Sequence, residues 1–111
     1  FNFGPISTKN YSVIKILQDL STSWDIKNPS EAYKITDDIK FHEAGLLKLN
    51  CDKALFHLSW LPTLNYDELI KFTGEWYFNF YKSNIDMLEF TWKQIDQYQK
   101  IAFNKNIKWT K

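Results

Sequence analysis

The segment NYDELIKFTGEWYFNFY, residues 65–81, decides the fold class. Asn65 is followed three residues later by Glu68, the spacing of a capping box, in which the two side chains bond each other's backbone N–H groups at a helix start. At 100° per residue, one side of this helix collects most of the aromatic and aliphatic side chains. The predicted buried stripe is centred on Leu69, Thr73, Trp76 and Phe80, with Ile70, Phe72, Tyr77 and Tyr81 beside it.

Phe78 lies outside this stripe, among Lys71, Glu75 and Lys82, so the helical pattern predicts an exposed ring there. The alternative for residues 75–93 is a β-hairpin in which EWYFNFY pairs with MLEFTWK and Phe78 joins the core. We prefer the helix because the capping box and the spacing of the stripe agree.

Other segments carry helix signals. A first helix is expected from a cap at Asn10 to about Ser21. In NPSE, residues 28–31, Asn28 is a good N-cap and Pro29 suits the first helical position. The apolar face of this second helix is predicted at Ile35, Ile39, His42, Leu46 and Leu49. A short helix is expected over residues 52–61.

The last helix is expected to open at Ser83 and Asp86. It has two apolar stripes, one of Ile85, Leu88, Trp92, Ile95 and Ala102 and one of Met87, Phe90, Tyr98 and Ile101. A helix that is apolar on two sides is either central or partly offered to a partner.

Together these signals predict an all-α fold, a compact single-domain bundle of about four to five helices over residues 10–104. Residues 1–9 are expected to form an extended N-terminal arm and residues 105–111 a basic C-terminal tail. The alternative is an α+β fold with the aromatic hairpin at 75–93.

Composition indicates a globular chain, since 44% of its 111 residues are hydrophobic and 18% are aromatic. The lone cysteine, Cys51, fits a reducing compartment. No segment has an apolar run of about 18 residues, and FNFGPIS lacks the shape of a signal peptide. We therefore expect a cytoplasmic protein with no membrane contact.

Charge is unevenly distributed. Residues 19–68 hold nine acidic residues against five lysines, whereas residues 100–111 hold four lysines and no acid. All 14 basic residues are lysine, and arginine is the preferred side chain for guanine and phosphate contacts. This counts against nucleic-acid recognition, although the lysine tail with Trp109 leaves weak nucleic-acid binding as an alternative.

Catalytic and metal signatures are missing from the sequence. His42, His57 and Cys51 do not have the spacing of zinc ligands, and nothing orients Cys51 and His57 as nucleophile and base. No phosphate-binding or nucleophile-elbow motif is present. We therefore expect a protein that is not an enzyme and has no cofactor or metal.

Surplus aromatic rings among acidic residues favour a protein-binding surface, since Tyr and Trp dominate interfaces and acids orient basic partners. The predicted partner-binding residues are Asp37, Asp38, Glu43, Asp67, Glu75, Phe78 and Phe90.

The interleaved acids and aromatics in WDIKNPSEAYKITDD, residues 24–38, and YDELIKFTGEWYFNFY, residues 66–81, resemble small bacterial immunity proteins of colicin-type and contact-dependent-inhibition toxins. This resemblance implies an inhibitor that occludes a cognate toxin domain, a basic nuclease, without transferring any family residue. The net charge of +1 departs from the clearly acidic balance of many such inhibitors. A non-inhibitory adaptor is the alternative, and the oligomeric state is left open.

Overall fold

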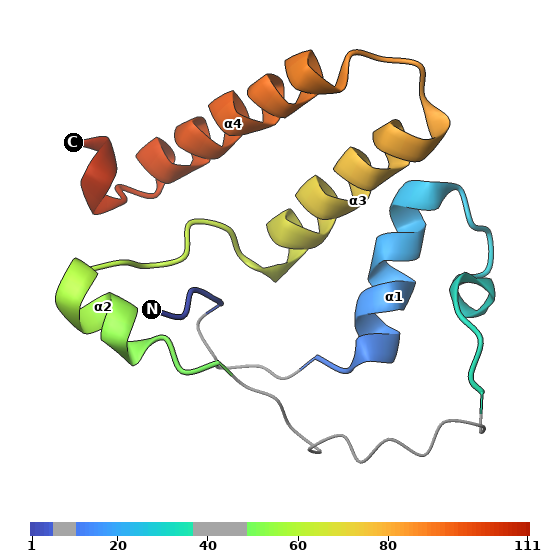
Figure 1. Ribbon diagram of the computed structural model, residues 1–111, viewed down its shortest axis with the longest axis horizontal. Helices are drawn as coiled ribbons and strands as arrows, with labels where there is room; N and C mark the ends of the chain where they lie inside the picture. Colours follow the sequence, from blue (N-terminus) through green and yellow to red (C-terminus); the bar gives the residue numbers. More distant parts are fainter. Residues whose placement is uncertain (6–10, 37–48) are drawn as a thin grey trace.

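The computed structural model describes residues 1–5, 11–36 and 49–111. Four α-helices lie in this part: α1 (Val13–Ser21), α2 (Asp52–Leu58), α3 (Tyr66–Lys82) and α4 (Met87–Asn104). Three short 3-10 turns accompany them: η1 (Thr22–Trp24), η2 (Pro29–Ala32) and η3 (Lys108–Thr110) (Figure 1). Within the described residues there is no strand, and α3 and α4 cover most of 75–93. The all-α prediction is therefore confirmed, and the hairpin alternative is wrong.

Side-chain caps explain where the longer helices begin. Asn65 Oδ1 accepts from the Glu68 N–H at 2.9 Å, and Glu68 Oε2 accepts from the Asn65 N–H at 2.7 Å, so the predicted capping box is present. α4 is capped by Asp86 rather than opened at Ser83. Ser12 caps α1, while Asn10 lies outside the described residues.

The helix predicted after Asn28 is not observed in the described residues. Asn28 does cap, accepting from the Ser30 N–H at 3.2 Å, but η2 ends at Ala32 and Tyr33 is extended, with φ −148° and ψ 160°. Tyr33 is held instead by a hydrogen bond that Gln18 of α1 donates to its hydroxyl at 3.3 Å. The continuation through residues 37–48 lies outside the described part.

α3 lies between α1 and α4, and the three helices spread side by side in one layer (Figure 1). The molecule measures 49 × 39 × 19 Å. Two hydrogen bonds of 2.9 Å link α3 to α4, from Trp76 Nε1 to Thr91 Oγ1 and from Gln94 Nε2 to the Phe72 carbonyl. On the other flank of α3, α1 and η1 pack against it.

The two flanking contacts decide which rings are covered. Trp24 of η1 packs edge-to-face on Phe78, with ring centroids 6.1 Å apart, so Phe78 is half-buried. The prediction of an exposed Phe78 is therefore wrong. Leu69 and Phe80, at the centre of the predicted buried stripe, are exposed because α1 and α4 pack on either side of them.

Candidate functional site

A groove opens where the end of α1 meets the start of α3. It is lined by two carboxylates, two hydroxyls, one apolar side chain and one amine, from Asp19, Thr22, Ser23, Asp67, Ile70 and Lys71, and encloses about 360 Å³. We call it the acidic groove. Asp19 comes from α1, Thr22 and Ser23 from η1, and the other three residues from the first two turns of α3.

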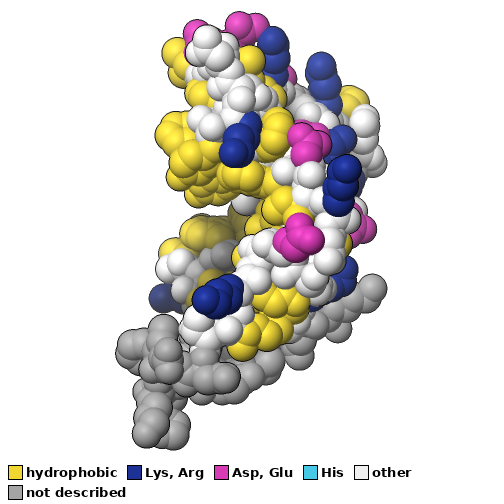
Figure 2. All heavy atoms as spheres, turned by 90° about the vertical axis from the view of Figure 1, so that its right-hand side faces the viewer, with side chains coloured by type: hydrophobic (Ala, Val, Ile, Leu, Met, Phe, Trp, Pro, Cys, Tyr) yellow, Lys and Arg dark blue, Asp and Glu magenta, His cyan; other side chains and the backbone are white. Residues whose placement is uncertain are grey.

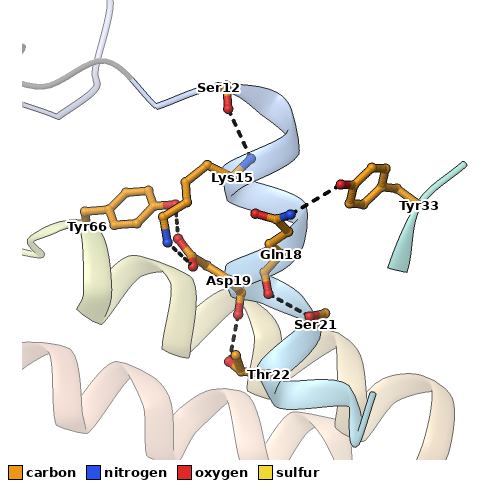
Figure 3. Close-up of polar contacts among 8 residues, drawn as sticks. All are labelled: Ser12, Lys15, Gln18, Asp19, Ser21, Thr22, Tyr33 and Tyr66. Carbon is orange, nitrogen blue, oxygen red and sulfur yellow. Dashed lines mark hydrogen bonds and ion pairs between the residues drawn. The ribbon is translucent and has the colours of Figure 1, made fainter. Parts of the chain in front are cut away.

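Asp19 is the most firmly held group of the acidic groove (Figure 3). Lys15, one turn earlier on α1, forms an ion pair with Asp19 Oδ1, and the Tyr66 hydroxyl donates to Asp19 Oδ2 at 2.7 Å. The Lys15 hydrogen bond, followed by the Tyr66 hydrogen bond, lowers the pKa of Asp19 below its ordinary value. Asp19 is therefore a fixed carboxylate at neutral pH.

Tyr66 is fixed in turn by its surroundings. Its ring stacks on Tyr11 with centroids 3.6 Å apart and planes 6° from parallel. Burial, and then the bond to the Asp19 carboxylate, raises the pKa of Tyr66 to about 12. The phenol stays neutral and donates its proton to Asp19 at every physiological pH.

Two hydroxyl groups satisfy carbonyls at the end of α1, beside the groove. The Thr22 hydroxyl donates to the Asp19 carbonyl at 2.7 Å, and the Ser21 hydroxyl donates to the Gln18 carbonyl at 2.6 Å (Figure 3). These are carbonyls of the last helical turn, which carries the negative end of the helix dipole.

On the opposite wall, Asp67 sits in the first turn of α3, where the positive helix end favours a carboxylate. Asp67 is exposed and makes no ion pair with another described residue. Lys71, the amine of the groove, lies 3.9 Å from the Glu75 carboxylate. The charge of Asp67 is therefore left available to a partner.

A glycine allows the two walls to meet. A Cβ atom built on Gly74, which is buried in the middle of α3, would lie 2.8 Å from Ser23 Cβ, closer than real contacts allow. The missing side chain lets η1 rest directly on α3 and places Thr22 and Ser23 in the groove.

The predicted partner-binding residues are distributed unequally. Asp67 lines the groove and Glu75 adjoins it through Lys71, whereas Phe90 is half-buried on α4. Phe78 is covered in part by Trp24. The remaining predicted residues, Asp37, Asp38 and Glu43, lie outside the described part of the chain.

Sequence reasoning missed Asp19, Thr22 and Gly74. The i, i+4 spacing of Lys15 and Asp19 was visible but indicates only a surface pair. A glycine inside a strongly capped helix was the better signal, since it marks close packing or a function. The pairing of Asp19 with Tyr66 joins residues 47 positions apart and has no local signature.

No group of three His, Cys, Asp or Glu side chains placed to hold a metal occurs among the described residues. In the same part of the chain, no helix is both long and apolar enough to cross a membrane. His57 packs against the rings of Phe1 and Phe56. Comparison with known proteins finds no matching family model, no matching characterised protein and no matching solved structure.

Proposed function

We propose that this chain is an immunity-type inhibitor. It binds a cognate bacterial toxin domain, a basic nuclease, in the cytoplasm of the producing cell and occludes its substrate groove. The acidic groove between α1 and α3 is the observation that supports this proposal. It presents the exposed Asp67 carboxylate to a partner, beside the Asp19 carboxylate, which Lys15 and Tyr66 already hold.

The groove suits one long basic side chain of the toxin. Its volume of about 360 Å³ is near the lower end of ligand pockets, which run from roughly 300 to 1,000 Å³. The Asp67 carboxylate would accept hydrogen bonds from a lysine or arginine head group. Ile70, half-buried at the same wall, would pack against the methylene stem.

Inhibition by occlusion needs no chemistry from the inhibitor. A nuclease collects basic side chains along its groove to neutralise phosphates. An acidic protein surface can pair with the same side chains and exclude the nucleic acid. Because Tyr66, Lys15 and Tyr11 already hold Asp19 and its surroundings in place, little ordering is needed at this wall on binding.

The proposal predicts that a toxin domain is encoded next to the gene for this chain, and the test uses the protein encoded there. Purified full-length chain is added to that domain, and hydrolysis of DNA and RNA is followed. Complete inhibition near a 1:1 ratio is the expected result. Undiminished hydrolysis at an excess of the chain would reject the inhibitor function.

A charge-reversal pair locates the surface. Asp67→Lys should slow association at least about tenfold at low ionic strength, and the difference should shrink as salt is added. Asp96→Lys makes the same charge change on α4, away from the groove, and should leave the rate near that of the unmodified chain. Equal rates for the two variants would exclude the acidic groove as the contact surface.

A further inference from the structure

The paired helices α3 and α4 leave a second surface uncovered. Three side chains of α3 and three of α4 form it, and 40–67% of each is exposed: Leu69, Tyr77, Phe80, Leu88, Trp92 and Ile95. We call these six residues the apolar face. Two further positions on the same side, Thr73 on α3 and Gln99 one turn beyond Ile95 on α4, are uncharged.

The α3 residues and the α4 residues of the apolar face lie on the same side of the helix pair. Trp76 and Thr91 mark where α3 and α4 touch. At 100° per residue, Phe80 follows Trp76 by 40° and Tyr77 by 100°, while Trp92 follows Thr91 by 100°. The two helices run antiparallel, so a rotation that is clockwise on α3 is anticlockwise on α4 when both are viewed from the same end. Because the helices face each other at the contact, these opposite rotations bring the α3 and α4 residues to the same side of the pair. Figure 2 shows a patch of hydrophobic side chains at the upper left of the molecule, with most of the charged side chains to the right of it.

A second layer is missing on this side. Stable domains bury the apolar stripes of their helices between two packed layers. Here the helices lie in one layer, and the buried apolar residues of the described part are two alanines, Ala54 and Ala102. The apolar face is the surface that a second layer would cover.

The size and composition of the apolar face fit a copy of the same chain. With about half of each of six side chains exposed, at roughly 200 Å² a side chain, one copy offers about 600 Å² and two offer about 1,200 Å², the lower limit of standard interfaces. A charge-free centre is typical of permanent homodimers, whereas partners that meet and separate use more polar surfaces. A second copy is also available as soon as the chain is made.

We propose that two copies pair through their apolar faces, related by a two-fold axis, so that two α3–α4 hairpins form a four-helix layer pair. The acidic groove lies on the other flank of α3, toward α1, and remains open in each copy. This inference does not depend on the inhibitor function.

The mass of the full-length chain in solution tests the dimer. Sedimentation equilibrium over a concentration series should give twice 13.3 kDa for the unmodified chain. Trp92→Lys places a charge in the apolar face and should give 13.3 kDa with unchanged helical circular dichroism. Phe56→Lys alters a phenylalanine that is 84% exposed on α2 and should remain dimeric. An unmodified chain that is monomeric throughout, or a dimer unaffected by Trp92→Lys, would overturn the proposal.

Cross-linking tests the dimer without placing a charge in the apolar face, a change that could disturb folding. Cys51 is the only cysteine, so Cys51→Ser gives a background for single thiols. Leu88→Cys should form a covalent dimer with a short bis-maleimide, whereas Gln97→Cys, on the opposite side of α4, should not. Equal cross-linking of both variants would overturn the proposal. It would also be overturned if the fluorescence of Trp92 became shielded from a soluble quencher only when the toxin domain is added. Failure of inhibition with an intact dimer would instead reject the function alone.

Discussion

Trp24 and Phe78 meet edge-to-face, with ring planes 88° apart, and thereby join η1 to the middle of α3. Phe78→Ala should lower the free energy of unfolding by roughly 2 kcal/mol, about half the cost at a fully buried phenylalanine, because this ring is half-buried. Urea denaturation at one fixed protein concentration measures the change.

Phe56→Ala is the matched control for this prediction. The Phe56 ring is 84% exposed on α2, so its loss should change the free energy of unfolding by less than about 0.5 kcal/mol. Equal effects of the two substitutions would contradict the packing of Phe78 against Trp24.

Replacing Gly74 by alanine should destabilise the fold, although the same change stabilises most helices. In an exposed helix, alanine is more favourable than glycine by about 1 kcal/mol. At Gly74 the added Cβ would stand 2.8 Å from Ser23 Cβ, and such overpacking costs about 1–3 kcal/mol, so Gly74→Ala should lower the melting temperature.

The double variant Gly74→Ala/Ser23→Gly isolates this contact. Removing the Ser23 side chain makes room for the new methyl group and should restore most of the lost stability relative to Ser23→Gly alone. A Gly74→Ala chain that melts at a higher temperature than the unmodified one would show that η1 does not rest on α3.

The capping signals predicted where helices begin more accurately than the helical periodicity predicted which side chains are buried. Asn65 and Glu68 form the expected box because the interaction is local and complete within four residues. The Asn28 cap is also present, yet only the 3-10 turn η2 follows it, and the extended Tyr33 accepts a hydrogen bond from Gln18 instead. A cap marks a possible beginning, and distant contacts decide how far the helix continues.

Burial within α3 depended on partners that periodicity does not identify. The stripe around Leu69 and Phe80 was correctly found to be apolar, but it is covered only in part. Trp76 and Phe72 are half-buried, whereas Leu69, Phe80 and Tyr77 are exposed. Phe78 is covered by Trp24, a residue 54 positions earlier in the chain. Asp67 was predicted to bind a partner, which stays a prediction, and the structure places it in the acidic groove. Its groove partner Asp19 depends on the same long-range docking of α1.

The Tyr66–Asp19 hydrogen bond should be visible in titrations. The absorbance of tyrosinate should show one of the six tyrosines ionising near pH 12, well above the ordinary value of about 10. Tyr66→Phe should remove this late step and should also raise the pKa of Asp19 toward 3.8, measured by carboxyl NMR.

The contributions of Tyr66 and Asp19 to stability depend on pH in opposite directions. The folded chain holds the Tyr66 proton more tightly than the unfolded chain, so this contribution is complete below about pH 10 and is lost as pH rises toward 12. The folded chain holds the Asp19 proton less tightly, so that contribution is present above about pH 3.8 and is lost as pH falls further. A titration in which no tyrosine ionised well above pH 10 would exclude the hydrogen bond.

Lys105 connects the end of α4 to the start of α3. Its ammonium group lies 2.5 Å from Glu68 Oε2 and donates to the Thr63 carbonyl at 2.9 Å. Lys105→Met should lower the free energy of unfolding by about 1 kcal/mol, since both bonds are lost and the carbonyl loses a partner. Lys93→Met breaks the pair with Glu89, in which both side chains are mostly exposed, and should cost well under about 1 kcal/mol.

The pH dependence of Lys105→Met separates this bridge from general packing. In the unmodified chain, Lys105 and then the Asn65 N–H lower the pKa of Glu68 below 4.5, so their contribution is present above that pH and is lost as pH falls. Without the ammonium group, the pKa of Glu68 should rise toward 4.5 but stay below it, because the Asn65 N–H still favours the carboxylate. The loss of stability in acid should therefore be shallower in Lys105→Met than in Lys93→Met. Parallel acid curves for the two variants would mean that Lys105 stabilises the fold by packing its stem, with no contribution from its charge.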